Sequence, residues 1–160
     1  MEQEYPNTLL RFADGAPIDL RQPLDAPARA QFAHHGLVGG FAVLSAYPAP
    51  TESCEEHESE ARARRLRAVI AAFDVEPIDV LATSADGRHR EPSLAAPLER
   101  RDALNIARLF HQAAQFWFDG EHMWIDWSDG RASTRLPVAP SSAQFRIRSA
   151  RAEIDESGAH

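Results

Sequence analysis

The stretch "GFAVLSAYPAPTESCEEHESEARARRLRAVIAAFDVEPIDVLATSA", residues 40–85, decides the fold. Its first part, 40–48, is an unbroken apolar run of strand length, which is typical of a strand buried on both faces. Residues 51–73 then place apolar side chains at helical spacing. These form one face: Leu66, Val69, Ile70 and Phe73. A second strand is predicted over 76–85, so the stretch predicts two parallel strands joined by a helix.

The residues that follow predict a second half of similar design. The expected elements are a weak strand over 92–98, a helix over 99–115 and a hairpin over 115–127 around Asp119-Gly120. The core from 40 to 118 is therefore predicted as β-α-β-β-α-β, with an added strand over 122–127. That order is the ferredoxin-like split βαβ pattern. We expect an α+β fold in which an antiparallel sheet carries both helices on one face.

Further elements are expected on both sides of this core. Residues 8–21 predict an N-terminal hairpin around Asp14-Gly15, and 24–36 predict a short helix with Asp25 as its N-cap. Residues 1–136 are expected to form one domain. The C-terminal extension 137–160 is predicted to be either an edge strand or a mobile arm.

Composition restricts the function classes. The chain has 160 residues, with 24 acidic against 17 basic side chains and a net charge of −7. This charge argues against nucleic acid and against anionic membrane surfaces as partners. No apolar run approaches the roughly 20 residues of a membrane helix, and the N-terminus lacks the apolar region of a secretory signal. A single cysteine, Cys54, suits a reducing compartment, so a cytoplasmic location is expected.

The predicted topology gathers charged residues at one end of the sheet. Both parallel strands end there, the first helix begins there and the second helix ends there. The apolar face of the first helix, extended backwards, reaches Arg62 and then Glu58. The residues expected at this end are Glu58, Arg62, His89, Arg90, Glu91, His111 and Gln112.

Five segments resemble an uncharacterised bacterial family, the domain of unknown function family 3293. They are "IDLRQP", "FAVLSAYPAP", "ESEARARRL", "REPSLAAPL" and "ALNIARLFHQAAQFWF", and the resemblance covers roughly residues 5 to 118. Carried onto this chain, the family's motif positions are Arg21, Glu58, Glu60, Arg62, Glu91, Ser93 and Gln112. The chain departs from the pattern in "SAYPAP", which lacks an asparagine, and at Ser59, which replaces another. The resemblance implies no activity.

Two explanations of the charged end remain open. Glu58 and Arg62 could pair along the helix, with Arg90 and Glu91 tying the loop to it as a structural clamp. Alternatively, Arg62 and Arg90 could grip a small anionic ligand, with Glu91 as the general base if a reaction followed and with Ser93 and Gln112 nearby. The spacing of His57, His89 and His111 matches no metal-binding motif, so no metal and no cofactor are expected.

The aromatic hairpin offers a different kind of site. Trp117, Trp124 and Trp127 are predicted to lie on an edge hairpin, where some of them would be exposed to a protein partner or a second copy. We find no catalytic motif in the sequence. The leading expectation is therefore a non-catalytic protein-binding subunit or regulator, and the alternative is a domain or enzyme that binds a small anionic ligand at the charged end.

Overall fold

The computed structural model describes residues 5–47 and 56–138. Its helices are η1 (Tyr5–Asn7, a single 3-10 turn), α1 (Ala26–His34), α2 (Glu56–Ala71) and α3 (Arg100–Leu109). Its strands are β1 (Thr8–Phe12), β2 (Ile18–Asp19), β3 (Phe41–Ser45), β4 (Ile78–Ser84), β5 (Arg90–Ala96), β6 (Ala114–Phe118), β7 (Met123–Trp127) and β8 (Thr134–Leu136). Within these ranges, none of the helices combines the length and apolar character that crossing a bilayer requires.

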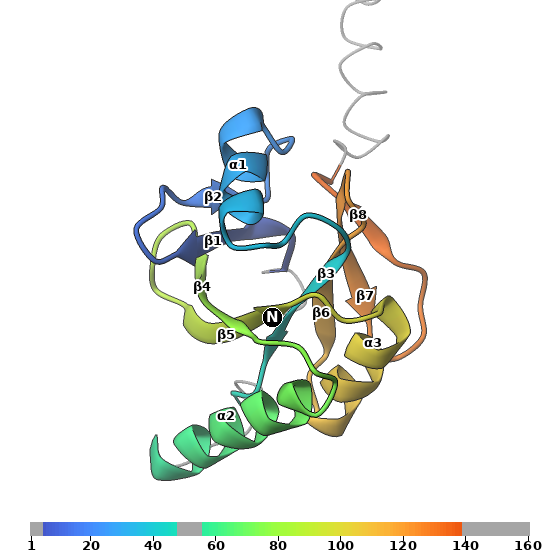
Figure 1. Cartoon of the computed structure of the whole chain (residues 1–160). Coiled ribbons are helices and arrows are strands. Elements are labelled where there is room, and N and C mark those ends of the chain that lie inside the picture. Colours follow the sequence, from blue (N-terminus) through green and yellow to red (C-terminus); the bar gives the residue numbers. More distant parts are fainter. Residues whose placement is uncertain (1–4, 48–55, 139–160) are drawn as a thin grey trace, which may run out of the picture.

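All eight strands form one antiparallel sheet in the order β2-β1-β4-β5-β3-β6-β7-β8. The sheet curls into a half-barrel, with α1 on its concave side and α2 and α3 below its convex side (Figure 1). Twisted sheets of this width commonly curl, because each strand is rotated relative to its neighbour.

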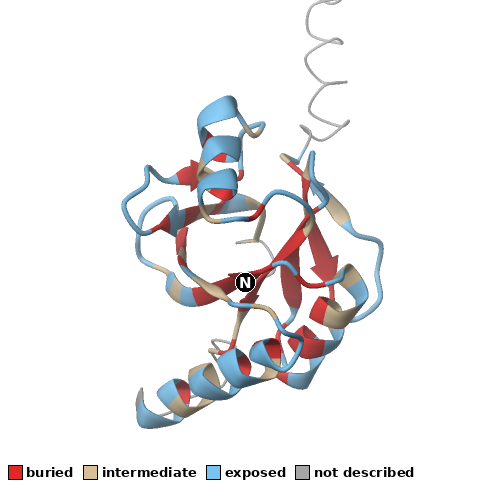
Figure 2. Cartoon of the chain, in the orientation of Figure 1, coloured by how far each residue is buried: buried red, intermediate tan, exposed pale blue. Residues whose placement is uncertain are grey.

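The curled sheet separates two apolar cores. The inner core lies on the concave side, where Phe32 of α1 packs against Phe41 and Phe118 at ring-centroid distances of 4.9 and 5.1 Å. The outer core joins the opposite face of the sheet to Leu66 and Ile70 of α2 and to the apolar side of α3. Strand β3 serves both cores, since its side chains alternate between them, and it is buried along almost its whole length (Figure 2).

The predicted ferredoxin-like core with helices on one face of the sheet is wrong. The hairpins at the two ends of the chain are not additions to a finished sheet. They add strands at both edges of the sheet, and the widened sheet curls. Its concave face then carries apolar side chains that must be shielded from water. Helix α1 provides that cover, so helices lie on both sides of the sheet.

Most local predictions are confirmed, and the differences lie at element ends. Asp25 caps α1 by accepting a hydrogen bond from the Ala28 amide at 2.9 Å. Helix α3 ends at Leu109 rather than near 115, and His111 just beyond it has a φ of 56°. Strand β8, which covers the hairpin β6–β7, was not predicted. Cys54 and most of the C-terminal extension fall outside the described ranges.

Candidate functional site

A pocket opens at one end of the half-barrel, on its concave side, and we call it the mouth pocket. It has a volume of about 50 Å³, several times the space that one water molecule needs. Strands contribute Thr8, Ala82, Thr83, Glu91 and Phe116 to its wall. The connections between elements contribute His89, His111, Gln112 and Ala113, and η1 contributes Tyr5. The strands β4 and β6 thus meet the end of α3 around a single opening.

Glu91 is the acidic side chain of this pocket. Strand alternation turns Glu91 inward together with Ser93 and Ala95 of β5, and only 23% of its side chain is exposed. Burial raises the pKa of the Glu91 carboxyl, while a hydrogen bond with the Ser45 side chain and the nearby His89 oppose the rise. His89 Nε2 lies 3.8 Å from Glu91 Oε2, which is too long for a direct hydrogen bond. The carboxyl therefore sits in a poorly hydrated place with few partners.

The turn that carries His89 has a defined local structure. The Ser84 hydroxyl donates to Asp86 at 2.6 Å and accepts from the His89 amide at 3.0 Å. Gly87 supplies the positive φ, 74°, that the tight reversal needs. The β4–β5 turn is thereby fixed, and with it the position from which His89 reaches the pocket.

Gln112 also lines the mouth pocket. Its side-chain Nε2 donates to the carbonyl oxygen of Tyr47 at 2.6 Å, and its backbone carbonyl oxygen accepts from the Ser128 hydroxyl at 2.6 Å. The residue is 8% exposed. One amide side chain thus links the end of β3 to the turn between α3 and β6.

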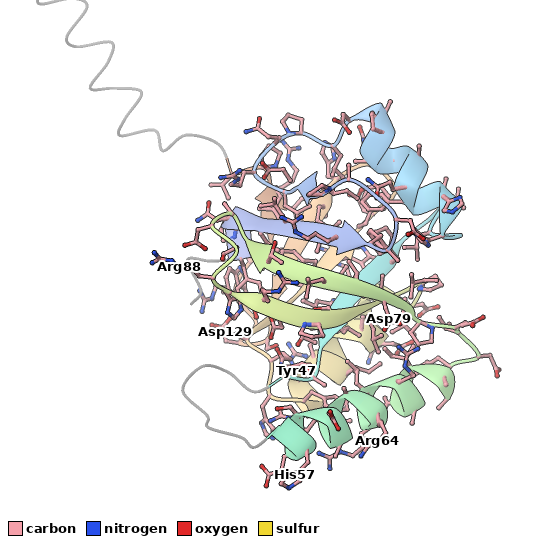
Figure 3. All side chains as sticks on the ribbon, turned by 90° about the vertical axis from the view of Figure 1, so that its left-hand side faces the viewer. Tyr47, His57, Arg64, Asp79, Arg88 and Asp129 are labelled. Atoms are coloured by element: carbon pink, nitrogen blue, oxygen red, sulfur yellow. The ribbon has the colours of Figure 1, made fainter. Side chains whose placement is uncertain are left out.

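The predicted charged cluster lies on both sides of the sheet. Figure 3 shows His57 at the start of α2 and Arg88 on the β4–β5 turn toward the same end of the molecule. Arg90 is exposed and points to the opposite face of β5 from Glu91, because neighbouring strand residues alternate. Arg62 on α2 donates to the carbonyl oxygen of Phe110 at 2.8 Å. The structure brings Glu91, His89, His111 and Gln112 together and leaves Arg62 and Arg90 outside their pocket.

The remaining family motif positions do not line the mouth pocket. Glu58 and Glu60 are exposed, and Ser59 rather than Glu58 continues the buried side of α2. Ser93 is buried and donates to the carbonyl oxygen of Glu91 at 3.1 Å. Arg21 pairs with Asp19 at 2.8 Å beside β2.

The aromatic hairpin is mostly internal. Trp117 and Trp127 are 9% and 7% exposed, and Trp124 alone of the three reaches intermediate exposure. The hairpin is not at the edge of the sheet, because β8 pairs with β7. The exposure on which the predicted protein interface depended is therefore missing for Trp117 and Trp127.

Several pocket residues were not singled out in the sequence. Tyr5 and Thr8 lie far from Glu91 along the chain, and only the pairing of β1 with β4 brings them to the pocket. Once that pairing is known, the alternation of side chains along each strand places Thr8 and Ala82 on the inward face. In the ranges that the structure describes, no three His, Cys, Asp or Glu side chains are placed to hold a metal ion.

A comparison with family models matches part of this chain. Neither the curated proteins nor the solved structures include a significant match to this chain. The family resemblance is confirmed for the central segment, which contains the polar wall of the mouth pocket: residues 46–114 match the model of the family described as protein of unknown function, DUF3293.

Proposed function

We propose that this protein binds a small organic molecule in the mouth pocket, without catalysing its conversion. The observation that carries the proposal is the state of Glu91. A carboxylate can accept about four hydrogen bonds, and Glu91 has the Ser45 side chain and the more distant His89 as its partners. A poorly hydrated carboxyl with acceptor positions to spare, in a pocket with apolar walls, is a common feature of ligand sites.

Asp126 is a useful comparison for Glu91, because it is a carboxylate with a structural role. Arg100 donates two hydrogen bonds to Asp126, at 2.8 and 2.6 Å, and Ser133 donates a third at 2.6 Å. Burial alone would raise the pKa of Asp126, but these donors hold it below its ordinary value. Glu91 lacks an arginine or lysine of this kind among its described neighbours, and its pKa moves in the opposite direction. The contrast favours a binding role for Glu91 over a structural one.

The walls of the pocket support a binding role as well. Tyr5, Ala82 and Phe116 give it an apolar side, while Glu91, Gln112 and the two histidines give it a polar side. Ligand pockets commonly combine an apolar lining with a few placed polar groups. The tie between Gln112 and Tyr47 fixes one wall, so the pocket exists before a ligand arrives.

The test is a fragment screen by protein-observed NMR with a blocked variant. Ala113 is an exposed lining residue, so Ala113→Phe should fill the opening with little effect on the core. Ala72→Phe, at an exposed position after α2, is the matched control. Fragments should shift the amide signals of His89, Glu91 and Ala113, and binding should be lost in Ala113→Phe but kept in Ala72→Phe. Hits that bind both variants equally, or a screen with no hit at these amides, would overturn the proposal.

A further inference from the structure

We propose that the ligand of the mouth pocket is a small organic cation, an amine on a short apolar body, with Glu91 as its counter-ion. This inference depends on the binding function proposed above and names the chemical class of the ligand. It follows from the charge of the lining, the spare acceptor positions of Glu91 and the aromatic wall.

The charge of the lining excludes an anion. Glu91 is the acidic side chain of the lining, and no lysine or arginine is among the described lining residues. Arg62 is engaged with Phe110, and Arg90 points to the other face of β5. An anionic ligand would meet a carboxylate without a compensating cation, which is costly in a poorly hydrated site. The arginine pair expected to grip an anion is not available here.

Glu91 has the hydrogen-bonding capacity that an ammonium group requires. An ammonium group offers three donors and no acceptor, and a carboxylate is acceptor-only when ionised. The Ser45 hydroxyl occupies one acceptor position of Glu91, and His89 at 3.8 Å is beyond hydrogen-bonding distance. An amine in the pocket could therefore donate to the carboxylate directly, in a charge-assisted hydrogen bond.

The aromatic lining of the pocket suits the rest of such a ligand. The rings of Tyr5 and Phe116 are 5.7 Å apart at an interplanar angle of 53°, and both line the pocket. Aromatic faces attract cations and also cover apolar groups. A neutral ligand would use the apolar wall but would leave the carboxylate without a counter-charge. The net charge of −7 adds a general attraction for cations.

The test compares three probes that have carbon chains of the same length and differ in charge: n-butylamine, n-butanol and n-butyrate. Each is titrated by NMR at about pH 7.5 into the wild type, Glu91→Gln and the control Glu76→Gln. Glu76 is exposed, precedes β4 and is not among the lining residues of the pocket. Butylamine should bind at least about tenfold more tightly than butanol, and butyrate should be the weakest. Glu91→Gln should remove the preference, and Glu76→Gln should keep it.

The outcomes separate this inference from the binding function. If butanol or butyrate binds the pocket as tightly as butylamine, the cation class is wrong and the binding function stands. If Glu91→Gln keeps the amine preference while its spectrum shows an intact fold, Glu91 is not the counter-ion. If no probe shifts the pocket amides although screen fragments do, the ligand class is wrong. If neither probes nor fragments bind there, the binding function itself fails.

Discussion

Gln112 Nε2 donates to the carbonyl oxygen of Tyr47 at 2.6 Å and so joins two parts of the chain that are 65 residues apart. Gln112→Ala should lower the free energy of unfolding by about 1–3 kcal/mol, because a part-buried carbonyl loses its donor. Asn105→Ala, at an exposed position of α3, is the control and should change stability by less than about 1 kcal/mol. Urea denaturation measures both. Equal effects would show that the tie contributes nothing.

Glu91 should make stability depend on pH. Because burial raises the pKa of Glu91 above its ordinary value of 4.5, the folded protein holds this proton more readily than the unfolded chain. The resulting stability is complete below 4.5 and is lost as the pH rises through the raised pKa. Glu91→Gln cannot ionise, so it should gain stability relative to the wild type as the pH rises from about 4 to about 7.

The groups that face Glu91 provide a second variant for this experiment. Ser45 donates to it from β3, His89 lies beside it at 3.8 Å, and His111 shares the pocket. The nearby His89 opposes the rise in the pKa of Glu91, so His89→Gln should raise that pKa further and enlarge the difference in stability between low and high pH. Denaturant unfolding at several pH values gives the differences. A constant difference between wild type and Glu91→Gln would contradict the prediction.

The pair formed by Arg100 and Asp126 should be far more important to stability than a pair on the surface. Asp126 has a side chain 3% exposed and Arg100 one that is 41% exposed. Asp126→Ala should cost about 2–4 kcal/mol, because it leaves the guanidinium and two further donors without their acceptor. Asp79→Ala breaks the pair of Arg67 and Asp79, whose side chains are 47% and 83% exposed. This control should cost less than about 1 kcal/mol in thermal or chemical unfolding.

Gly40 is needed for its size. A Cβ atom at this position would lie 2.7 Å from the Cζ2 atom of the buried Trp117 ring, a distance that forces the ring to move. Gly40→Ala should therefore lower stability by about 1–3 kcal/mol through overpacking. Gly39→Ala meets nothing within 4 Å and is the matched control. Similar melting temperatures for the two variants would rule out the predicted clash.

Local signals made the elements predictable. The Asp25 cap, the Asp-Gly turns and the helical spacing of Leu66 and Ile70 act over a few residues, and the structure contains the corresponding elements. The curl of the sheet is non-local, because it depends on how many strands join. One clue was available: the unbroken apolar run of β3 required a cover on both faces, which a sheet with helices on one face does not provide.

The sequence predicts which end of the sheet carries the site. It does not predict which face of the sheet each side chain points to. Topology alone places the β4–β5 turn and the end of α3 together, which brings His89 near Gln112. Arg90 and Glu91 are neighbours on a strand and must point to opposite faces, so the two side chains cannot both line one pocket. The helical spacing predicts Glu58 on the buried side of α2, but the buried residue is Ser59, the next position along the chain.

The two outermost strands of the sheet are very short. Strand β2 has two residues and β8 has three, so the rims of the half-barrel present few unpaired backbone groups. Addition of a strand from another chain gains its affinity from such groups. We therefore expect the rims to resist edge-to-edge association, so that concentrated solutions of the folded protein do not grow fibrils through continued sheet extension.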